Sequence, residues 1–150
     1  FVGIALSAGV GLLGRGVGLD RDRAFYPTVL MVVASYYVLF AALGASLSAL
    51  LAESVAMTAF VVAAVAGFRS SPWIVVAALA GHGLFDAVHG SLLENPGVPA
   101  WWPAFCLAYD VGAAAFLAWI LRRRAQAAIS SERAKPCESR TWWNWKTHRT

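Results

Sequence analysis

Charge is what this sequence has least of. Only 13% of its 150 residues are charged, whereas 59% are hydrophobic and the mean hydropathy is +0.62. In soluble domains about a quarter of the residues are charged, so this composition excludes an ordinary soluble domain. Together with apolar runs of about 20 residues, it is typical of a polytopic membrane protein.

The beginning of the chain lacks both a methionine and a basic region. Phe1 already lies inside an apolar segment, whereas a secretory signal peptide needs a positively charged start. Residues 1–14 are therefore expected to be the remainder of a clipped helix. Cysteine is scarce as well: Cys106 falls in an apolar segment and Cys137 in the polar tail, so no disulfide is expected between them.

Basic residues exceed acidic ones, but their placement argues against a nucleic-acid partner. The net charge of +4 comes from residues in loops and in the tail, which is the pattern that membrane topology produces. The GVGLLG run at residues 9–14 resembles a dinucleotide fingerprint, yet it has no preceding strand. Membrane lipids are the expected partners, and with so few helices a homo-oligomer is an open alternative.

The apolar segments predict an all-α fold, an integral membrane bundle of about five transmembrane helices with the first one truncated. Segments of 18–22 residues are long enough to cross a core of ~30 Å at ~1.5 Å per residue. Ser71-Pro72 is typical of a helix start, and Pro103 opens the last segment. The boundary at residues 44–46 is the weakest. The predicted segments are 1–14, 27–45, 47–68, 73–93 and 104–121.

Arginine placement predicts the orientation in the cell membrane. The second and fourth loops contain no Lys or Arg, whereas the first loop, the third loop and the tail do. Under the positive-inside rule, these three are cytoplasmic and the 94–103 loop faces out. The predicted domains are a transmembrane domain at 1–121 and a basic, tryptophan-containing cytoplasmic tail at 122–150. The tail is expected along the inner membrane surface, with disorder or a frame-shifted end as alternatives. The arginines that decide the orientation are Arg15, Arg21, Arg23, Arg69, Arg122, Arg123 and Arg124.

Three acidic residues, Glu53, Asp86 and Asp110, lie inside predicted helices, where a charge costs ~2.5–3.5 kcal/mol each on insertion scales. Counting residues along each helix places Asp86 ~5 Å, Asp110 ~4 Å and Glu53 ~7 Å to the outer side of the midplane. His82 falls near the midplane and His89 ~10 Å outward. One band in the outer half of the membrane is therefore expected to hold all five ionisable groups.

The spacing within GHGLFDAVHG, residues 81–90, sharpens this expectation. His82, Asp86 and His89 stand at i, i+4 and i+7, within about 60° of arc on one helical face. Cys106 and Asp110 are likewise i and i+4 on the next helix. Imidazole, thiolate and carboxylate are ligand types of zinc and iron. The sequence thus predicts metal ligands at His82, Asp86, His89, Cys106 and Asp110, and no other cofactor; haem is not expected, because two histidines on one helical face cannot flank one iron.

Other interpretations of the same residues stay open. Asp86 could simply accept hydrogen bonds from His82 or His89 and tie the helices together. Cys106 could be a small buried apolar side chain. One of Tyr36 and Tyr37, near the midplane of the second predicted helix, could reach the cluster, although packing between helices is the simpler role.

The run H82-x-x-x-D86-x-x-H89, followed by N95-P96-G97-V98-P99, P103, C106 and D110, resembles a family of small uncharacterised bacterial membrane proteins, a domain of unknown function. The similarity covers residues 82–110. Members of that family tend to have a second histidine where this chain has Gly90. The resemblance implies a polytopic helical protein and no established activity.

Three classes of function follow from these patterns. The first is an outward-facing metal-dependent hydrolase for a lipid-like substrate, in which Asp86 and Glu53 are catalytic and a bound metal lowers the pKa of a water. The second is a proton-coupled transporter or channel component that uses the same carboxylates and histidines. The third is a structural scaffold with a buried polar network.

Overall fold

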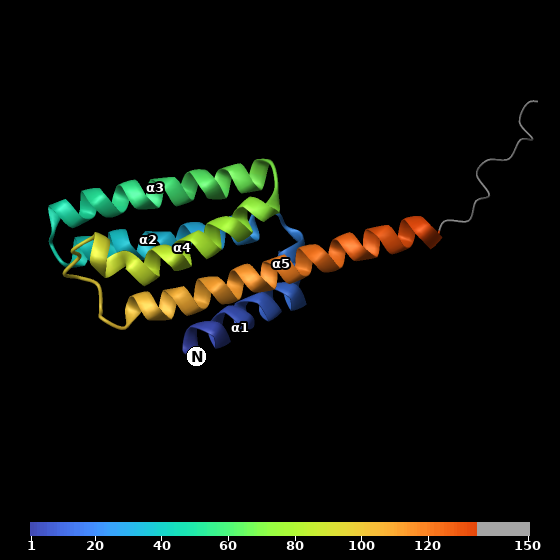
Figure 1. The fold of residues 1–150 in the computed structure, drawn as a ribbon, viewed down its shortest axis with the longest axis horizontal. Coiled ribbons are helices and arrows are strands. Elements are labelled where there is room, and N and C mark those ends of the chain that lie inside the picture. Colours follow the sequence, from blue (N-terminus) through green and yellow to red (C-terminus); the bar gives the residue numbers. More distant parts are fainter. Residues whose placement is uncertain (135–150) are drawn as a thin grey trace, which may run out of the picture. The chain divides into compact units, whose positions relative to one another are not determined.

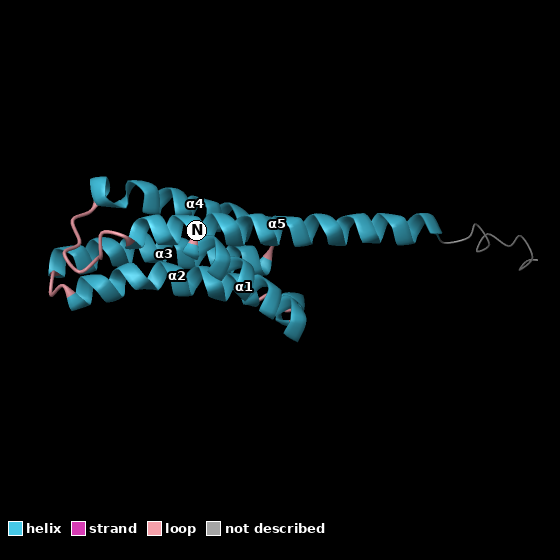
Figure 2. Cartoon of the chain, turned by 90° about the horizontal axis from the view of Figure 1, so that it is seen from below, coloured by secondary structure: helices cyan, strands magenta, loops and turns pink. Residues whose placement is uncertain are grey.

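The structure is a computed structural model that describes residues 1–134. Within that range it is all-helical, with short connections between the helices (Figures 1 and 2). The predicted fold class is confirmed. The elements are α1 (Val2–Val17), the 3-10 helix η1 (Leu19–Arg21), α2 (Phe25–Leu43), α3 (Leu47–Arg69), α4 (Pro72–Leu92) and α5 (Trp102–Ala134).

Four of these helices, α2, α3, α4 and α5, are long and apolar enough to cross a membrane. The helix α1 is apolar but shorter, with 16 residues. A bilayer core offers no hydrogen-bond partners to the backbone, so a spanning chain must be helical there. The protein is therefore a multi-pass membrane protein.

Local capping explains where the spans begin. The hydroxyl of Ser46 accepts a hydrogen bond from the amide of Ala49 at 3.3 Å, and that of Ser71 accepts one from Trp73 at 3.4 Å. The uncertain boundary at residues 44–46 is a tight turn, in which Ala45 has a φ of 50°. Short polar caps of this kind satisfy amides that would otherwise have no partner in the first turn.

The last helix is longer than the apolar pattern indicated. It continues to Ala134, whereas the apolar segment ends at 121. The extension is rich in Ala and Arg, which are strong helix formers whether or not they face lipid. Hydropathy indicates where the apolar part of a helix ends, at residue 121 here, and α5 continues as a helix beyond that residue.

The chain divides into two units, Phe1–Trp119 and Ile120–Thr150. Within the first, α2 packs on α3 and α4, and α3 packs on α4. The described part of the second is the C-terminal portion of α5, residues 120–134. Most of the predicted tail, including Cys137 and His148, lies outside the described residues, and the domain boundary at 121 stays a prediction.

On α3 the carboxylate points inward and the large apolar side chains point outward, as lipid exposure requires. On α3, Leu51 and Val55 are 62% and 73% exposed, whereas Glu53 between them is 1% exposed. The remaining buried residues of α3 are small, Ala49, Ala64 and Gly67. Small residues let helix backbones approach when both solvent and core are apolar. The buried face of α3 thus combines small residues with one ionisable side chain, whereas the large buried apolar side chains, such as Leu30 and Leu79, come from other helices.

Candidate functional site

The centre of the bundle holds a group of three ionisable side chains from two helices. Nδ1 of His82 on α4 lies 2.6 Å from Oδ2 of Asp110 on α5 and 3.5 Å from Oδ2 of Asp86. One ligand atom from each residue lies within 4.8 Å of the other two. All three are buried, with exposed fractions of 1%, 1% and 0% for His82, Asp86 and Asp110. We call these residues the His–Asp–Asp group.

Helix geometry explains the convergence. His82 and Asp86 are one turn apart on α4, so they share a face whatever the helix packs against. Asp110 reaches them because α5 lies against α4 at Gly83, where a Cβ would be 3.4 Å from the Cβ of Asp110, an ordinary packing distance. The ring of Phe60 packs edge-on against the His82 imidazole, with centroids 4.7 Å apart. The group therefore sits in apolar surroundings, where electrostatic interactions are strong.

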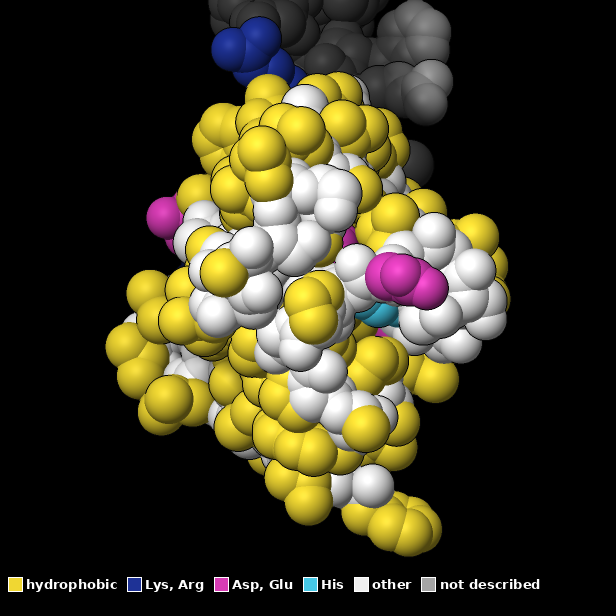
Figure 3. Space-filling view, turned by 90° about the vertical axis from the view of Figure 1, so that its left-hand side faces the viewer, with side chains coloured by type: hydrophobic (Ala, Val, Ile, Leu, Met, Phe, Trp, Pro, Cys, Tyr) yellow, Lys and Arg dark blue, Asp and Glu magenta, His cyan; other side chains and the backbone are white. Residues whose placement is uncertain are grey.

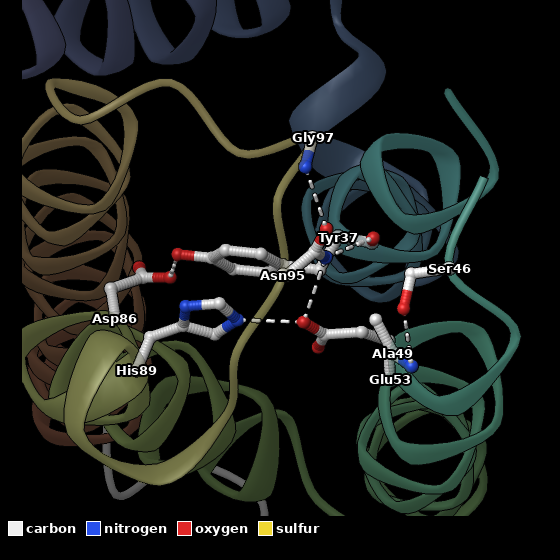
Figure 4. Close-up of polar contacts among 8 residues, drawn as sticks. All are labelled: Tyr37, Ser46, Ala49, Glu53, Asp86, His89, Asn95 and Gly97. Carbon is white, nitrogen blue, oxygen red and sulfur yellow. Dashed lines mark hydrogen bonds and ion pairs between the residues drawn. The ribbon is translucent and has the colours of Figure 1, made fainter. Parts of the chain in front are cut away.

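Tyr37 connects this group to α2. Its hydroxyl donates a 2.7 Å hydrogen bond to Oδ1 of Asp86 (Figure 4). The sequence left open which of two adjacent tyrosines reaches the cluster. The structure answers this: Tyr37 is buried at the site, whereas Tyr36 packs edge-on against Trp102.

A second polar pair lies beside the first group. Nε2 of His89 on α4 is 2.7 Å from Oε1 of Glu53 on α3, and both side chains are buried. The ring of Tyr37 stacks on the His89 imidazole with centroids 4.0 Å apart (Figure 4). Tyr37 therefore contacts both the His–Asp–Asp group and the Glu53–His89 pair.

The loop between α4 and α5 closes over this pair. The Asn95 amide donates 3.0 Å hydrogen bonds to Oε1 of Glu53 and to the backbone carbonyl of Tyr37, and its own oxygen accepts from the Gly97 amide (Figure 4). A Cβ on Gly97 would overlap the carbonyl of Phe40, so only glycine lets the loop approach α2 this closely. The sequence pattern did not identify Asn95 as a site residue; its signal was the Asn-Pro pair in the loop.

Several carboxylate oxygens at the site lack a hydrogen-bond partner among the described residues. They are Oδ2 of Asp86, Oδ1 of Asp110 and Oε2 of Glu53. Buried polar atoms are nearly always satisfied, and an unpaired buried charge is costly. Three such oxygens in one region indicate an environment suited to protons or a cation.

The five residues predicted as metal ligands thus divide. His82, Asp86 and Asp110 come together. His89 instead pairs with Glu53, the predicted catalytic base. Cys106 is buried one turn from Asp110 and lines a separate cavity between α1, α2 and α5.

The polar interior can be seen from the end of the bundle that carries the α2–α3 and α4–α5 connections. The surface of this end is largely apolar, and histidine atoms are visible at the bottom of a recess beside an acidic side chain (Figure 3). The polar interior thus lies close to this end of the molecule.

Comparison with known proteins adds no assignment. No known protein family, curated protein or solved structure matches the chain. The similarity to uncharacterised bacterial membrane proteins stays a prediction. What is established is a multi-pass helical membrane protein with a buried His–Asp–Asp group.

Proposed function

We propose that the protein is a membrane-embedded, metal-dependent hydrolase whose divalent cation is held by His82, Asp86 and Asp110. The observation that carries the proposal is the convergence of three ligand atoms within 4.8 Å in a fully buried position. Two carboxylate oxygens of the same group accept no hydrogen bond from described residues. A cation would satisfy them and offset the cost of burying two carboxylates.

The donor set suits a hydrolytic metal. One imidazole and two carboxylates are ligands of Zn²⁺ and of Fe²⁺. Three protein ligands leave a tetrahedral ion one open position, which is characteristic of catalytic rather than structural zinc sites. A metal in such a site makes water a nucleophile near neutral pH.

The protein's own side chains would supply the remaining functions. The Tyr37 hydroxyl fixes the orientation of Asp86 through its 2.7 Å hydrogen bond, as outer hydrogen bonds orient metal ligands elsewhere. Asp86 or Asp110, each with one oxygen that accepts no hydrogen bond from described residues, would accept the proton of the attacking water. Glu53 is held by His89 and Asn95 across the His89 ring from Asp86 (Figure 4). The lipid-like substrate is expected because α2 to α5 are long and apolar enough to span a membrane.

Elemental analysis of detergent-purified protein tests the metal. Wild type should contain about one zinc or iron per chain, and His82→Gln and Asp110→Asn should lose it while eluting as folded protein. Glu94→Gln removes an exposed carboxylate from the α4–α5 connection and should keep the metal. Absence of metal from folded wild type incubated with Zn²⁺ and Fe²⁺ would overturn the proposal.

A hydrolysis assay tests the reaction separately. Vesicles that contain ester-linked and amide-linked lipids should release fatty acid with wild type, and chelation or Asp86→Asn should abolish the release. A bound metal without any hydrolysis would keep the cation site and reject the hydrolase.

Proton movement is the second candidate, favoured by the chain of short contacts. His82 contacts Asp110 and Asp86, and Asp86 accepts a hydrogen bond from Tyr37. The ring of Tyr37 stacks on His89, which pairs with Glu53. Such relays of ionisable groups mark proton pathways in membranes. In metal-free proteoliposomes, a pH-gradient dye would report proton flux that is lost in Asp86→Asn. Loss of stability alone in that variant would instead indicate a structural scaffold.

A further inference from the structure

A cavity of about 1000 Å³ lies between α1, α2 and α5. This is the upper end of the volume range of small-molecule sites, ~300–1,000 Å³. Its walls are mostly apolar, with Leu6 and Val10 from α1, Val29 from α2 and Phe105 from α5. The cavity is distinct from the His–Asp–Asp group, none of whose members is among its lining residues.

The cavity is elongated along the helices. On α2 its lining extends from Phe25 to Tyr36, which corresponds to about 17 Å at ~1.5 Å per residue. On α1 it extends from Val2 to Val10. An apolar space that extends along the helices fits a hydrocarbon chain better than a compact polar solute.

Close packing of α1 on α5 keeps this space from collapsing. A Cβ on Gly3 would overlap the carbonyl of Phe105, and one on Gly112 would overlap the hydroxyl of Ser7. The two backbones are therefore already as close as they can be. At the far end of α1, Gly14 lies against the ring of Phe25, which holds α1 away from the middle of α2.

We propose that this cavity holds a hydrocarbon chain of a membrane lipid. Its walls include α2 and α5, which are long and apolar enough to cross the bilayer, so the neighbouring molecules are acyl chains and not water. An apolar space without an occupant loses dispersion contacts on all its walls. A chain that enters from the bilayer regains these contacts without burying any polar group.

The cavity is lined by close sequence neighbours of two residues of the proposed active site. Cys106 lines it and lies one helical turn from Asp110, and Tyr36 lines it next to Tyr37. A lipid whose chain fills the cavity would therefore contact Cys106, one helical turn from the proposed metal ligand Asp110. Resting on the proposed function, this makes the bound lipid the substrate class of the hydrolase, with Cys106 as the contact between chain and site.

Photo-cross-linking tests the occupant directly. The protein is reconstituted into phosphatidylglycerol and phosphatidylethanolamine vesicles that contain phosphatidylglycerol with a diazirine on one acyl chain, and labelled peptides are mapped by mass spectrometry. Val29→Trp fills the cavity. The matched control Val62→Trp makes the same change on α3, where the side chain is 62% exposed and does not line the cavity.

Wild type and Val62→Trp should carry label on cavity residues of α1, α2 and α5, and Val29→Trp should lose it while the exposed face of α3 stays labelled. Equal labelling of the cavity in all three proteins would overturn the inference. So would an unlabelled cavity in wild type that a bifunctional cross-linker joins into a dimer through this face, since the occupant would then be a second chain.

The metal proposal and the lipid proposal can be rejected independently of each other. Asp110→Asn should lose metal yet keep the cavity label. Cavity labelling in a protein that never binds metal would reject the hydrolase and its substrate and keep the lipid site. Metal-dependent lipid hydrolysis that Val29→Trp leaves unchanged would reject the substrate role of the cavity alone.

Discussion

The ring of Tyr37 lies nearly parallel to the imidazole of His89, with centroids 4.0 Å apart and an angle of 18° between the planes. The hydroxyl of the same tyrosine donates to Asp86 at 2.7 Å. Tyr37 therefore joins the two polar clusters of the bundle, one by stacking and one by a hydrogen bond. Each contact can be removed separately, which makes this residue the best place to begin testing the site.

Tyr37→Phe should keep the stacking and lose the hydrogen bond to Asp86. Removing one buried partner costs about 0.5–2 kcal/mol of stability, and losing an outer hydrogen bond weakens metal binding by about 10–100-fold. Unfolding in detergent and competition with a zinc chelator measure the two effects. Tyr36→Phe, one residue away and packed on Trp102, is the control, and equal behaviour of both variants would contradict the role assigned to Tyr37.

The Glu53–His89 pair should behave as one unit in a double-mutant cycle. Glu53→Ala and His89→Ala each leave the other partner buried without its 2.7 Å contact, so their effects should not add. A coupling of about 0.5–3 kcal/mol is expected for groups in direct contact. Pairing His89→Ala with Asp22→Asn, in the connection between α1 and α2, should give additive effects. Additive effects of Glu53→Ala and His89→Ala would mean that the contact between these two side chains contributes no coupling energy.

Asn95→Ala should free the loop between α4 and α5. The amide side chain makes three hydrogen bonds, two of them to α2 and α3, and the methyl group of alanine replaces none of them. Backbone hydrogen exchange at residues 93–101 should become faster, because local opening becomes less costly. Glu94→Ala, at the exposed neighbouring position, should leave the exchange rate as it is, and an unchanged rate in Asn95→Ala would show that the loop is held by other contacts.

Two glycine substitutions should have opposite effects. Gly97→Ala would drive a methyl group into the Phe40 carbonyl, and overpacking of this kind costs about 1–3 kcal/mol. Gly90→Ala meets nothing within 4 Å and should be neutral or stabilise α4 by up to ~1 kcal/mol. Thermal unfolding in detergent compares them, and a tolerated Gly97→Ala would mean that the loop can move away from α2.

Cysteine labelling tests the predicted orientation. In a chain with Cys137→Ser, a membrane-impermeant maleimide added to intact cells should label Glu94→Cys, on the loop expected outside. Ser70→Cys, between α3 and α4, should react only after permeabilisation, because the arginine pattern assigns that side to the cytoplasm. Cys106 is buried and should contribute no background. The reverse labelling pattern would show that the topology is inverted and that the Asn95 loop lies inside the cell.

Much of the architecture could be predicted from the sequence, because the relevant physics is local. A chain in lipid must pair its own backbone groups, so apolar segments of spanning length become helices. The one-turn spacing of His82 and Asp86 puts them on one face regardless of their neighbours. Counting residues gave depths that match the observed partners: His82 with Asp110, and the more outward His89 with Glu53.

The tertiary structure decided which residues at one depth meet. Depth follows from the rise per residue, whereas rotation about the helix axis depends on how neighbouring surfaces pack. That rotation brings Asp110 to His82 and leaves Cys106 lining the apolar cavity. The loop path that carries Asn95 to Glu53 depends on the close approach of Gly97 to α2. The sequence by itself therefore determined a helical membrane protein with its ionisable groups in one band, and packing divided that band into a His–Asp–Asp group and a Glu–His pair.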